Sequence, residues 1–217
     1  MRPTPETMLP DFYGTVAEDM LAYCRAAPGR IWVDLGSGTG GIGLALLARL
    51  PVSRLIFMDP DSQALHQALA RAHQHGYGTR TMTVAGSAET IPLQDESVDA
   101  VVSRGSVYFW QDRARGIAQI WRVLRPGGRA MIGGGLGSGY PRWARSQFIQ
   151  RRRDSMAAKG PHAAREFAAA RSPETFRRLA TEAGLPDFIV AGGGDLEPHD
   201  PDSGIGIWLQ FSKTHAT

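Results

Sequence analysis

Short apolar stretches alternate along this sequence with longer stretches of helical character, and this alternation limits the possible folds more than any other feature. The stretches that predict buried strands cover residues 30–35, 55–58, 81–85, 98–103 and 130–132. Strands that alternate with helices at this spacing form a parallel sheet covered by helices on both faces. The sequence therefore predicts an α/β fold with a doubly wound sheet.

The segments between the strands carry helix signals. One helix is predicted over 42–50, ending before Pro51, whose ring cannot continue a helix. A second begins after Asp61, a residue type that caps helices, and stops at Gly76. A third covers 112–124 and ends at the Pro-Gly-Gly sequence that follows it.

The last third of the chain ends in two further strands, predicted at 188–190 and 205–211 after a helix that runs from Ser172 to Gly184. The link between the strands, 191–204, is rich in glycine and has no helix signal. A parallel pair needs a crossover, which is normally a helix. We therefore expect the last two strands to be antiparallel, in a mostly parallel seven-stranded sheet with an antiparallel last strand.

A glycine-rich turn, VDLGSGTG at 33–40, joins the first strand to the first predicted helix of the sheet. Turns of this kind hold nucleotide-like ligands. Gly36, Gly38 and Gly41 also match the G-x-G-x-x-G pattern of NAD(P)-binding proteins, in which Asp59 would bind the ribose. Compact oxidoreductases commonly place a lysine four residues after a tyrosine, and no tyrosine in this chain is followed by one. A small NAD(P)-dependent oxidoreductase remains the alternative enzyme.

The glycine-rich turn also matches the cofactor-binding turn of a second family of nucleotide-binding proteins. Four further sequence features follow the turn in the order in which that family has them. Asp59, at the end of the second strand, stands where the family keeps a ribose-binding acid. Together, these features resemble Rossmann-like SAM-dependent methyltransferases, and most closely small-molecule enzymes related to the ubiquinone/menaquinone C-methyltransferases. The matching segments are DLGSGTG at 34–40 (D/E-x-G-x-G-x-G), GSAETIPL at 86–93 (G-D-A-x-x-L-P-F), SVDAVV at 97–102 (F-D-x-V) and RVLRPGG at 122–128 (R-V-L-K-P-G-G).

The resemblance implies a SAM-dependent methyltransferase that acts on a small molecule. The cofactor has no phosphate and carries a sulfonium and an ammonium, so a carboxylate at Asp34 suits its charge. Asp59 can accept hydrogen bonds from two ribose hydroxyls. The alternative is that Asp34 caps loop amides and Asp59 only starts a helix. The predicted cofactor-binding residues are Tyr13, Asp34, Gly36, Ser37, Gly38, Gly40, Asp59, Pro60, Ser87, Ala88, Arg104, Gly105 and Ser106.

Residues for the methyl acceptor are expected after the fourth strand and in the last third of the chain. Segment 103–110 lacks the N/D-P-P-Y/F sequence of methyltransferases that act on adenine or glutamine. Tyr108, Trp110 and Tyr140 are the predicted substrate-binding residues, with core packing as the alternative for the first two. No catalytic residue is assigned.

Residues 140–171 hold seven Arg and one Lys against Asp154 and Glu166, a net charge of +6. We expect a basic helical insertion here and a lid helix within 1–29, both parts of one domain over 1–217. A basic lid attracts an anionic small molecule or lies on nucleic acid, and a solvated helix is the alternative account of most of these charges. Aromatic residues for base stacking are few, so a small acidic or aromatic acceptor ranks above nucleic acid.

Other classes of protein find little support. No run approaches the ~20 apolar residues of a membrane-spanning helix, and the N-terminus lacks a signal-peptide pattern, so a cytoplasmic protein is expected. Cys24 is the only cysteine, which excludes an internal disulfide. His73 and His75 point to different helix faces, and the acidic segment 195–202 is typical of a loop, so no metal is predicted. A SAM-binding protein without catalysis is the alternative outside the enzymes.

Overall fold

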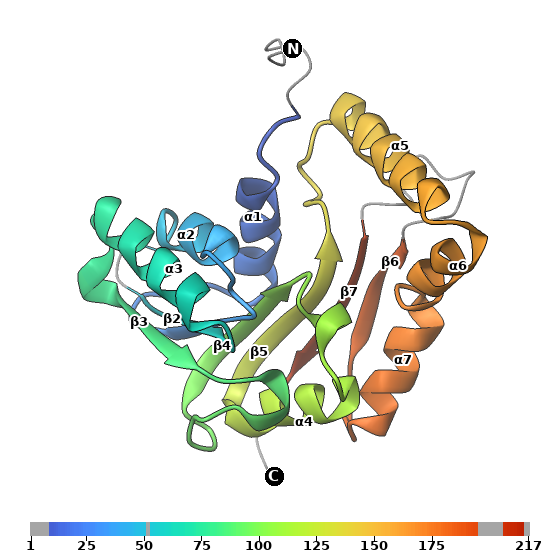
Figure 1. Cartoon of the computed structure of the whole chain (residues 1–217). Coiled ribbons are helices and arrows are strands. Elements are labelled where there is room, and N and C mark those ends of the chain that lie inside the picture. The colour runs from blue at the N-terminus through green and yellow to red at the C-terminus, as the bar shows by residue number, and fades with distance from the viewer. Residues whose placement is uncertain (1–8, 51–52, 195–205, 215–217) are drawn as a thin grey trace.

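The computed structural model describes residues 9–50, 53–194 and 206–214, and a seven-stranded sheet forms its centre (Figure 1). The strands follow the spatial order β3-β2-β1-β4-β5-β7-β6. β1 to β5 pair in parallel, and β7 runs antiparallel to both β5 and β6. The predicted mostly parallel sheet with an antiparallel last strand is therefore confirmed. The strands are β1 (Ile31–Leu35), β2 (Arg54–Asp59), β3 (Thr81–Ala85), β4 (Val98–Arg104), β5 (Leu124–Gly135), β6 (Ile189–Gly194) and β7 (Gly206–Ser212).

Helices cover both faces of the sheet (Figure 1). α1, α2 and α3 pack on one face, and α4 and α7 pack on the other. α5 and α6 follow β5 and lie on the β7–β6 side in Figure 1. None of the helices within the described ranges is long and apolar enough to cross a membrane. The helices are α1 (Tyr13–Tyr23), α2 (Gly41–Leu47), α3 (Ser62–Gln74), α4 (Arg113–Val123), α5 (Arg142–Ala158), α6 (Pro161–Ala169) and α7 (Pro173–Glu182), with short 3₁₀ turns η2 (Gly78–Arg80), η3 (Ala88–Thr90) and η4 (Val107–Phe109).

The central strands are apolar on both sides, as a sheet between two helical layers requires. On β1, Trp32 faces the core under α1 to α3 and Val33 faces the core under α4 and α7. Leu55 and Ile56 divide in the same way on β2. These side chains are at most 5% exposed. Burial on both faces fixes the strand register, because a shift of one residue would exchange the two cores.

Helix starts follow the predicted caps. The side chains of Asp61 and Ser172 accept hydrogen bonds from the first-turn amides of α3 and α7. Asp112 caps α4 in the same way. α3 and α7 are followed by Gly76 and Gly184, which adopt left-handed backbone angles of +77° and +74°. The predicted ends of α3 and α7 are therefore confirmed.

Two predicted helix ends were wrong, and the fifth and sixth strands, Leu124–Gly135 and Ile189–Gly194, are longer than predicted. α2 stops at Leu47 rather than residue 50, because its last turn tightens and the Arg49 amide donates to the Leu46 carbonyl three residues back. α4 stops at Val123, and Leu124 already pairs with Val98 in the sheet. The Pro-Gly-Gly sequence thus lies within an irregular start of β5. Pro51 and residue 205 lie outside the described residues.

Candidate functional site

The site lies at the carboxyl ends of the central strands. β1 pairs with β2 on one side and with β4 on the other, so the chain direction around the sheet reverses at β1 and β4. Loops that leave two neighbouring strands there turn to opposite faces and open a crevice between them. The glycine loop after β1 and the η4 segment after β4 flank this crevice.

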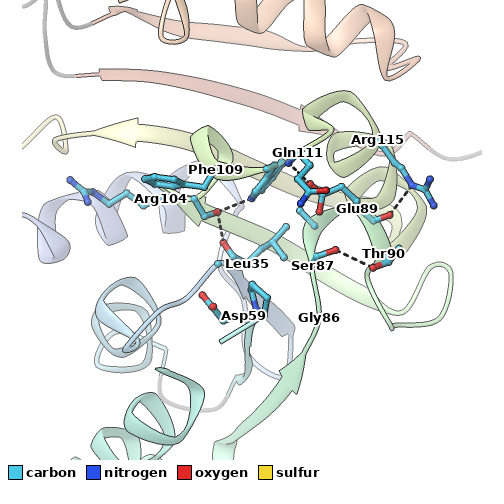
Figure 2. A pocket seen from close by; sticks show the side chains of 16 residues that line it. Leu35, Asp59, Gly86, Ser87, Glu89, Thr90, Arg104, Phe109, Gln111 and Arg115 are labelled. Atoms are coloured by element: carbon cyan, nitrogen blue, oxygen red, sulfur yellow. Dashed lines mark hydrogen bonds between the residues drawn. The ribbon is translucent and has the colours of Figure 1, made fainter. Parts of the chain in front are cut away.

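A cavity of about 810 Å³ occupies the crevice (Figure 2). Its walls come from the ends of β1, β2, β3 and β4 and from the segment that precedes α4. A space of this size accommodates a nucleoside with an attached side chain. The lining residues are Leu35, Gly36, Asp59, Pro60, Gly86, Ser87, Ala88, Glu89, Thr90, Arg104, Gly105, Ser106, Phe109, Trp110, Gln111 and Arg115.

A smaller cavity of about 210 Å³ lies over the glycine loop. It shares Gly36 and Arg104 with the larger cavity, so the two adjoin at these residues. Tyr13 of α1 covers the loop, because a Cβ on Gly41 would come within 2.5 Å of its ring. The lining residues are Tyr13, Asp34, Gly36, Ser37, Gly38, Thr39, Gly41, Ile42 and Arg104.

Backbone hydrogen bonds hold the glycine loop over the end of β2. The amides of Gly36 and Ser37 both donate to the carbonyl of Met58, at 2.7 and 3.1 Å. Gly36 has a φ of +70°, and a Cβ there would lie 2.1 Å from the Cβ of Ser106. Glycine is therefore required at this position both for its backbone angle and for the close approach of the loop after β4.

Asp34 is buried beneath the loop at 2% exposure. Its Oδ2 accepts a hydrogen bond of 2.8 Å from the amide of Gly43 in α2. Burial raises the pKa of Asp34 to about 7, the Gly43 hydrogen bond opposes the rise, and the negative charge of Asp59 adds to it. Near neutral pH this carboxyl group is therefore poised between its two protonation states, and it lines the smaller cavity.

Asp59 ends β2 and lines the larger cavity. Its Oδ2 accepts from the amide of Gly38 at 2.8 Å, and its Oδ1 accepts from the amide of Asp61 at 2.9 Å. Asp34 and Asp59 therefore both accept hydrogen bonds from backbone amides. This agrees with the alternative interpretation of the sequence, in which the two carboxylates only hold the backbone. Each carboxylate oxygen of Asp59 has a second lone pair, so it can still accept hydrogen bonds from a ligand.

Ser106 connects the end of β1 to the aromatic wall of the larger cavity. Its hydroxyl donates to the Leu35 carbonyl at 3.0 Å and accepts from the indole Nε1 of Trp110 at 3.2 Å. The hydroxyl of Ser103 lies 2.5 Å away. The Trp110 ring also packs against α4, where a Cβ on Gly116 would lie 2.7 Å from it. These contacts fix the orientation of Trp110.

Glu89 anchors the opposite end of the larger cavity. Its Oε1 accepts from the amides of Gln111 and Asp112, at 2.7 and 3.3 Å. Partial burial acts to raise the pKa of Glu89, but hydrogen bonds from its own amide, from Ser87 and from these amides outweigh burial and lower it. This carboxylate therefore stays ionised while it ties the turn after β3 to the start of α4.

Arg104 extends from the end of β4 between the two cavities. Its Nε donates to the Gly135 carbonyl at 3.1 Å, and its guanidinium lies 3.9 Å from the ring centroid of Phe12. Its terminal nitrogens make no hydrogen bond or ion pair within the described part of the chain. They remain available to a negatively charged ligand group.

The structure brings the predicted cofactor residues together. All of them except Gly40 line one of the two cavities. Gly40 instead caps α2 with a φ of +85° and packs against Phe57 and Ala68. Of the predicted acceptor residues, Trp110 lines the larger cavity.

Tyr108 and Tyr140 lie outside the lining of both cavities. The Tyr108 ring packs over Gly134 and against Phe176. Tyr140 is buried, and its hydroxyl donates to the Pro10 carbonyl at 2.9 Å. Both therefore act on the cavities only through neighbouring residues.

Sequence reasoning missed several lining residues near the start of α4. Phe109 and Gln111 adjoin the predicted Trp110, and Glu89 lies inside the matched segment 86–93. The signal for Phe109 was present in the aromatic run YFW. Nothing local to Gln111 or Arg115 marks them, because their place depends on how the turn after β3 docks on α4.

Within the described ranges, no group of three or more His, Cys, Asp or Glu side chains is placed to hold a metal ion. His75 stacks on Tyr77 at 6.0 Å, and a Cβ on Gly78 would lie 2.2 Å from His73. The acidic segment 195–202 lies outside the described residues.

Residues 33–132 match the family model described as "Methyltransferase domain". The solved structure of a Methanococcus maripaludis protein, assigned as an S-adenosyl-L-methionine-dependent methyltransferase, has a TM-score of 0.75 and 27% identity, covering 95% of this chain and 87% of that one. Residues 33–132 are therefore similar to a methyltransferase domain, and the fold is that of Rossmann-like (class I) SAM-dependent methyltransferases. The ligand to compare with the two cavities is S-adenosylmethionine, which the name of the Methanococcus maripaludis protein gives.

Two curated methyltransferases are similar to part of this chain, and each similarity covers only part of the relative's own length. The chloroplastic 2-methyl-6-phytyl-1,4-hydroquinone methyltransferase of Arabidopsis thaliana is 35% identical over 117 residues, which are 54% of this chain and 32% of that protein. The malonyl-[acyl-carrier protein] O-methyltransferase of Methylococcus capsulatus is 36% identical over 116 residues, 52% of this chain and 41% of that protein. The chain thus spans less than half the length of these relatives.

The residues around the larger and the smaller cavity fit S-adenosylmethionine. The Ser37 hydroxyl is buried in the smaller cavity with no hydrogen-bond partner in the described part of the chain. The side of Gly38 where a Cβ would stand is open. Asp34 and Asp59 supply negative charge for a ligand that carries a sulfonium and an ammonium, whereas they would repel a pyrophosphate.

Proposed function

We propose that this protein transfers the methyl group of S-adenosylmethionine to a small-molecule acceptor. The observation that carries the proposal is the pair of adjoining cavities at β1 and β4. One contains the glycine loop and Asp34, and the other contains Asp59 and the aromatic segment after β4. In this arrangement the cofactor spans both cavities, and the aromatic side of the larger cavity is left for a second molecule.

The proposed cofactor contacts follow from the lining. Asp59 accepts hydrogen bonds from the ribose hydroxyls, and Pro60, Ser87 and Ala88 line the adenine. The departure of Ser87 from the family's usual Asp removes an acceptor for the adenine amino group. At the other end, the methionine part lies along Gly36, Ser37, Gly105 and Ser106.

The methionine carboxylate falls between Tyr13 and Arg104 in this assignment. Both residues line the smaller cavity, and Arg104 offers a fork of N–H donors that suits a carboxylate. Asp34 lines the same cavity, and its negative charge favours the ammonium and the sulfonium. The two ends of the amino acid thus meet groups of opposite sign.

When bound, S-adenosylmethionine supplies a methyl group on a positively charged sulfur. The acceptor atom forms a bond to the methyl carbon as the carbon–sulfur bond breaks, and the electron pair remains on sulfur. The chain contributes alignment of acceptor, methyl and sulfur. Trp110, fixed by Ser106 and Gly116, is the proposed rigid wall for the acceptor.

The acceptor is proposed to be acidic or aromatic. Residues 140–171 supply positive charge beside the cavities, and the names of the relatives include a hydroquinone and a malonyl group. We further propose one domain over 1–217, in which the region of α1 and the helices α5 and α6 act as lids. Nucleic acid ranks below a small molecule, and a cytoplasmic location stays a prediction from the sequence.

Calorimetry with S-adenosylmethionine and with NAD⁺ tests the cofactor. We expect heat of binding for the first and none for the second, and the reverse result would restore the oxidoreductase alternative. Transfer of labelled methyl groups from S-adenosylmethionine to a panel of acidic and aromatic metabolites tests catalysis. Tight cofactor binding with no transfer to any acceptor would favour the non-catalytic alternative.

A further inference from the structure

A separate cavity, of about 340 Å³, lies at the opposite end of the sheet from the crevice. Arg30 directly precedes β1, and Arg129 of β5 pairs with Ala100 near the start of β4 and with Ser212 at the end of β7. These residues mark the end at which β1 and β4 begin, whereas the crevice lies where both strands end. The cavity shares no lining residue with the larger or the smaller cavity of the crevice. This basic cavity is lined by residues 25, 30, 127, 129 and 212–214.

Four positively charged side chains from distant parts of the sequence line the basic cavity. Two lie between α1 and β1, one belongs to β5, and one follows β7; they are Arg25, Arg30, Arg129 and Lys213. In the part of the chain that the structure describes, none of the three arginines forms an ion pair, whereas Lys213 pairs with Glu96 at 3.1 Å. Three uncompensated positive charges therefore share one concave place, and an anion that enters it relieves their repulsion.

Arg129 and Lys213 are held in place by contacts within the chain. One terminal nitrogen of Arg129 donates to the Tyr23 carbonyl at 3.2 Å, and the guanidinium lies 5.4 Å from the centroid of the Tyr23 ring. The other nitrogens of this guanidinium make no hydrogen bond within the described ranges. The Lys213 side chain is only 14% exposed, and its Nζ donates to the Arg122 carbonyl at 3.3 Å. Donors that are already fixed lose little freedom when an anion binds, which favours binding.

Arg25 occupies a backbone position that favours glycine. It follows Cys24, the C-cap of α1, and has a φ of +51°. The next amide, of Ala26, donates to the Leu21 carbonyl at 3.0 Å, the hydrogen bond that closes a helix end of this kind. A side chain with a Cβ disfavours this left-handed angle, so arginine costs stability here that glycine would not. An anion bound by the Arg25 guanidinium offsets this cost, and backbone strain of this kind is typical of binding sites.

We propose that the basic cavity binds the phosphate group of a small molecule, and that Arg25, Arg30 and Arg129 are the binding residues. A guanidinium offers paired N–H donors that match the oxygens of a phosphate. Ser212 and Thr214 also line the cavity and carry hydroxyl donors. The volume suits a phosphate with a modest attached group. The inference does not rest on the proposed function, because the basic cavity shares no residue with the crevice.

Carboxylates near the basic cavity favour a small ligand over an extended polyanion. Glu96 pairs with the Lys213 ammonium at 3.1 Å. Asp99 accepts a hydrogen bond of 2.8 Å from the amide of Ile31, the residue that follows Arg30. A nucleic-acid backbone needs a continuous basic surface and would meet these negative charges on either side of the cavity. A single phosphate group reaches the arginines without meeting the carboxylates.

Calorimetry with pyrophosphate at constant ionic strength tests the inference. The unaltered protein should bind pyrophosphate saturably, and R25G and R30Q should each weaken binding by about tenfold. Glycine suits the backbone angle at residue 25, so R25G should also raise the Tm of the protein without pyrophosphate, which separates lost binding from lost folding. R165Q removes an exposed arginine on α6 and is the matched control, which should leave the affinity unchanged.

Four results would overturn the inference. The first is the absence of saturable heat with pyrophosphate at millimolar concentration. The second is equal weakening by R165Q, which would show only unspecific attraction by net charge. The third is binding that R104Q abolishes and R25G does not, which would place the anion in the crevice. The fourth is a single-stranded oligonucleotide that binds more tightly than pyrophosphate and is lost in R25G, which would assign the surface to nucleic acid. None of these measurements uses S-adenosylmethionine, so they leave the proposed function untouched.

Discussion

The two ends of the crevice are built differently. At the cofactor end, each wall is a short turn directly after a strand, and local features such as glycines and a helix cap set its shape. At the acceptor end, the wall comes from η4 and the start of α4, and its shape depends on how the turn after β3 docks on α4 in the folded protein. The cofactor end therefore tolerates little change, whereas the acceptor end can vary in sequence without loss of the fold.

The sharpest test of this contrast lies within the glycine loop. Gly36→Ala should cost about 3 kcal/mol of unfolding free energy, because it combines a positive φ with a clash against Ser106. Thermal unfolding should show a fall in Tm of roughly 6–12 °C. Gly38→Ala, which has a positive φ but open space, should cost only about 1 kcal/mol. Equal effects would mean that the contact with Ser106 is unimportant.

Asp59→Asn should weaken S-adenosylmethionine by about 50-fold, since hydrogen bonds to a charged group contribute about 1.5–3 kcal/mol. Titration calorimetry measures this change. Asp61→Asn is the control, because asparagine also caps helices and residue 61 lies outside both cavities. If Asp59→Asn and Asp61→Asn bind S-adenosylmethionine with equal affinity, Asp59 accepts hydrogen bonds only from backbone amides and does not contact the cofactor.

Cofactor affinity should rise by about tenfold between pH 6 and pH 8, because Asp34, with a pKa of about 7, must ionise to attract a cation. In the absence of ligand, the contribution of Asp34 to the stability of the fold changes with pH in the opposite direction. The raised pKa stabilises the fold below the unfolded value of 3.8, and this contribution is lost as the pH rises through 7.

Asp34→Asn removes the titrating group from the cofactor end and provides the comparison. The titration of the ligand's own amine is common to both proteins, so the difference between their pH profiles isolates Asp34. Calorimetry in two buffers at pH 7 should also show that Asp34 releases about half a proton on binding, relative to Asp34→Asn. Parallel profiles for the two proteins would exclude Asp34 from cofactor binding.

The smallest effect is expected on the surface of α5. Trp143 is 53% exposed, so Trp143→Gln should change the unfolding free energy by no more than about 0.5 kcal/mol. Chemical denaturation measures this change. A loss above 2 kcal/mol would show that α5 is as constrained as the glycine loop, and the contrast between the two ends would fail.

More of the cofactor end than of the acceptor end could be predicted from the sequence. Local turns shape the cofactor end, whereas tertiary packing shapes the acceptor end. Asp34, Asp59 and the loop glycines occupy fixed distances from strand ends, so the predicted strands together with the family resemblance located them. Tyr108 and Tyr140 were predicted from residue type and from their places after the fourth strand and in the basic segment, and neither lines a cavity in the structure. Side-chain direction in a turn or after a long strand depends on packing partners that sequence spacing does not specify.

The sequence by itself determined the strand order along the chain, the helix caps and the carboxylates at the ends of β1 and β2, because these depend on local periodicity and on residue type. Only the tertiary structure decided that Arg104, Arg152 and Arg171 join one series with Phe12, Phe148 and Phe167. These residues are separated along the chain by up to about 160 positions, and the free energy that brings them together comes from burial of the sheet and helices that carry them.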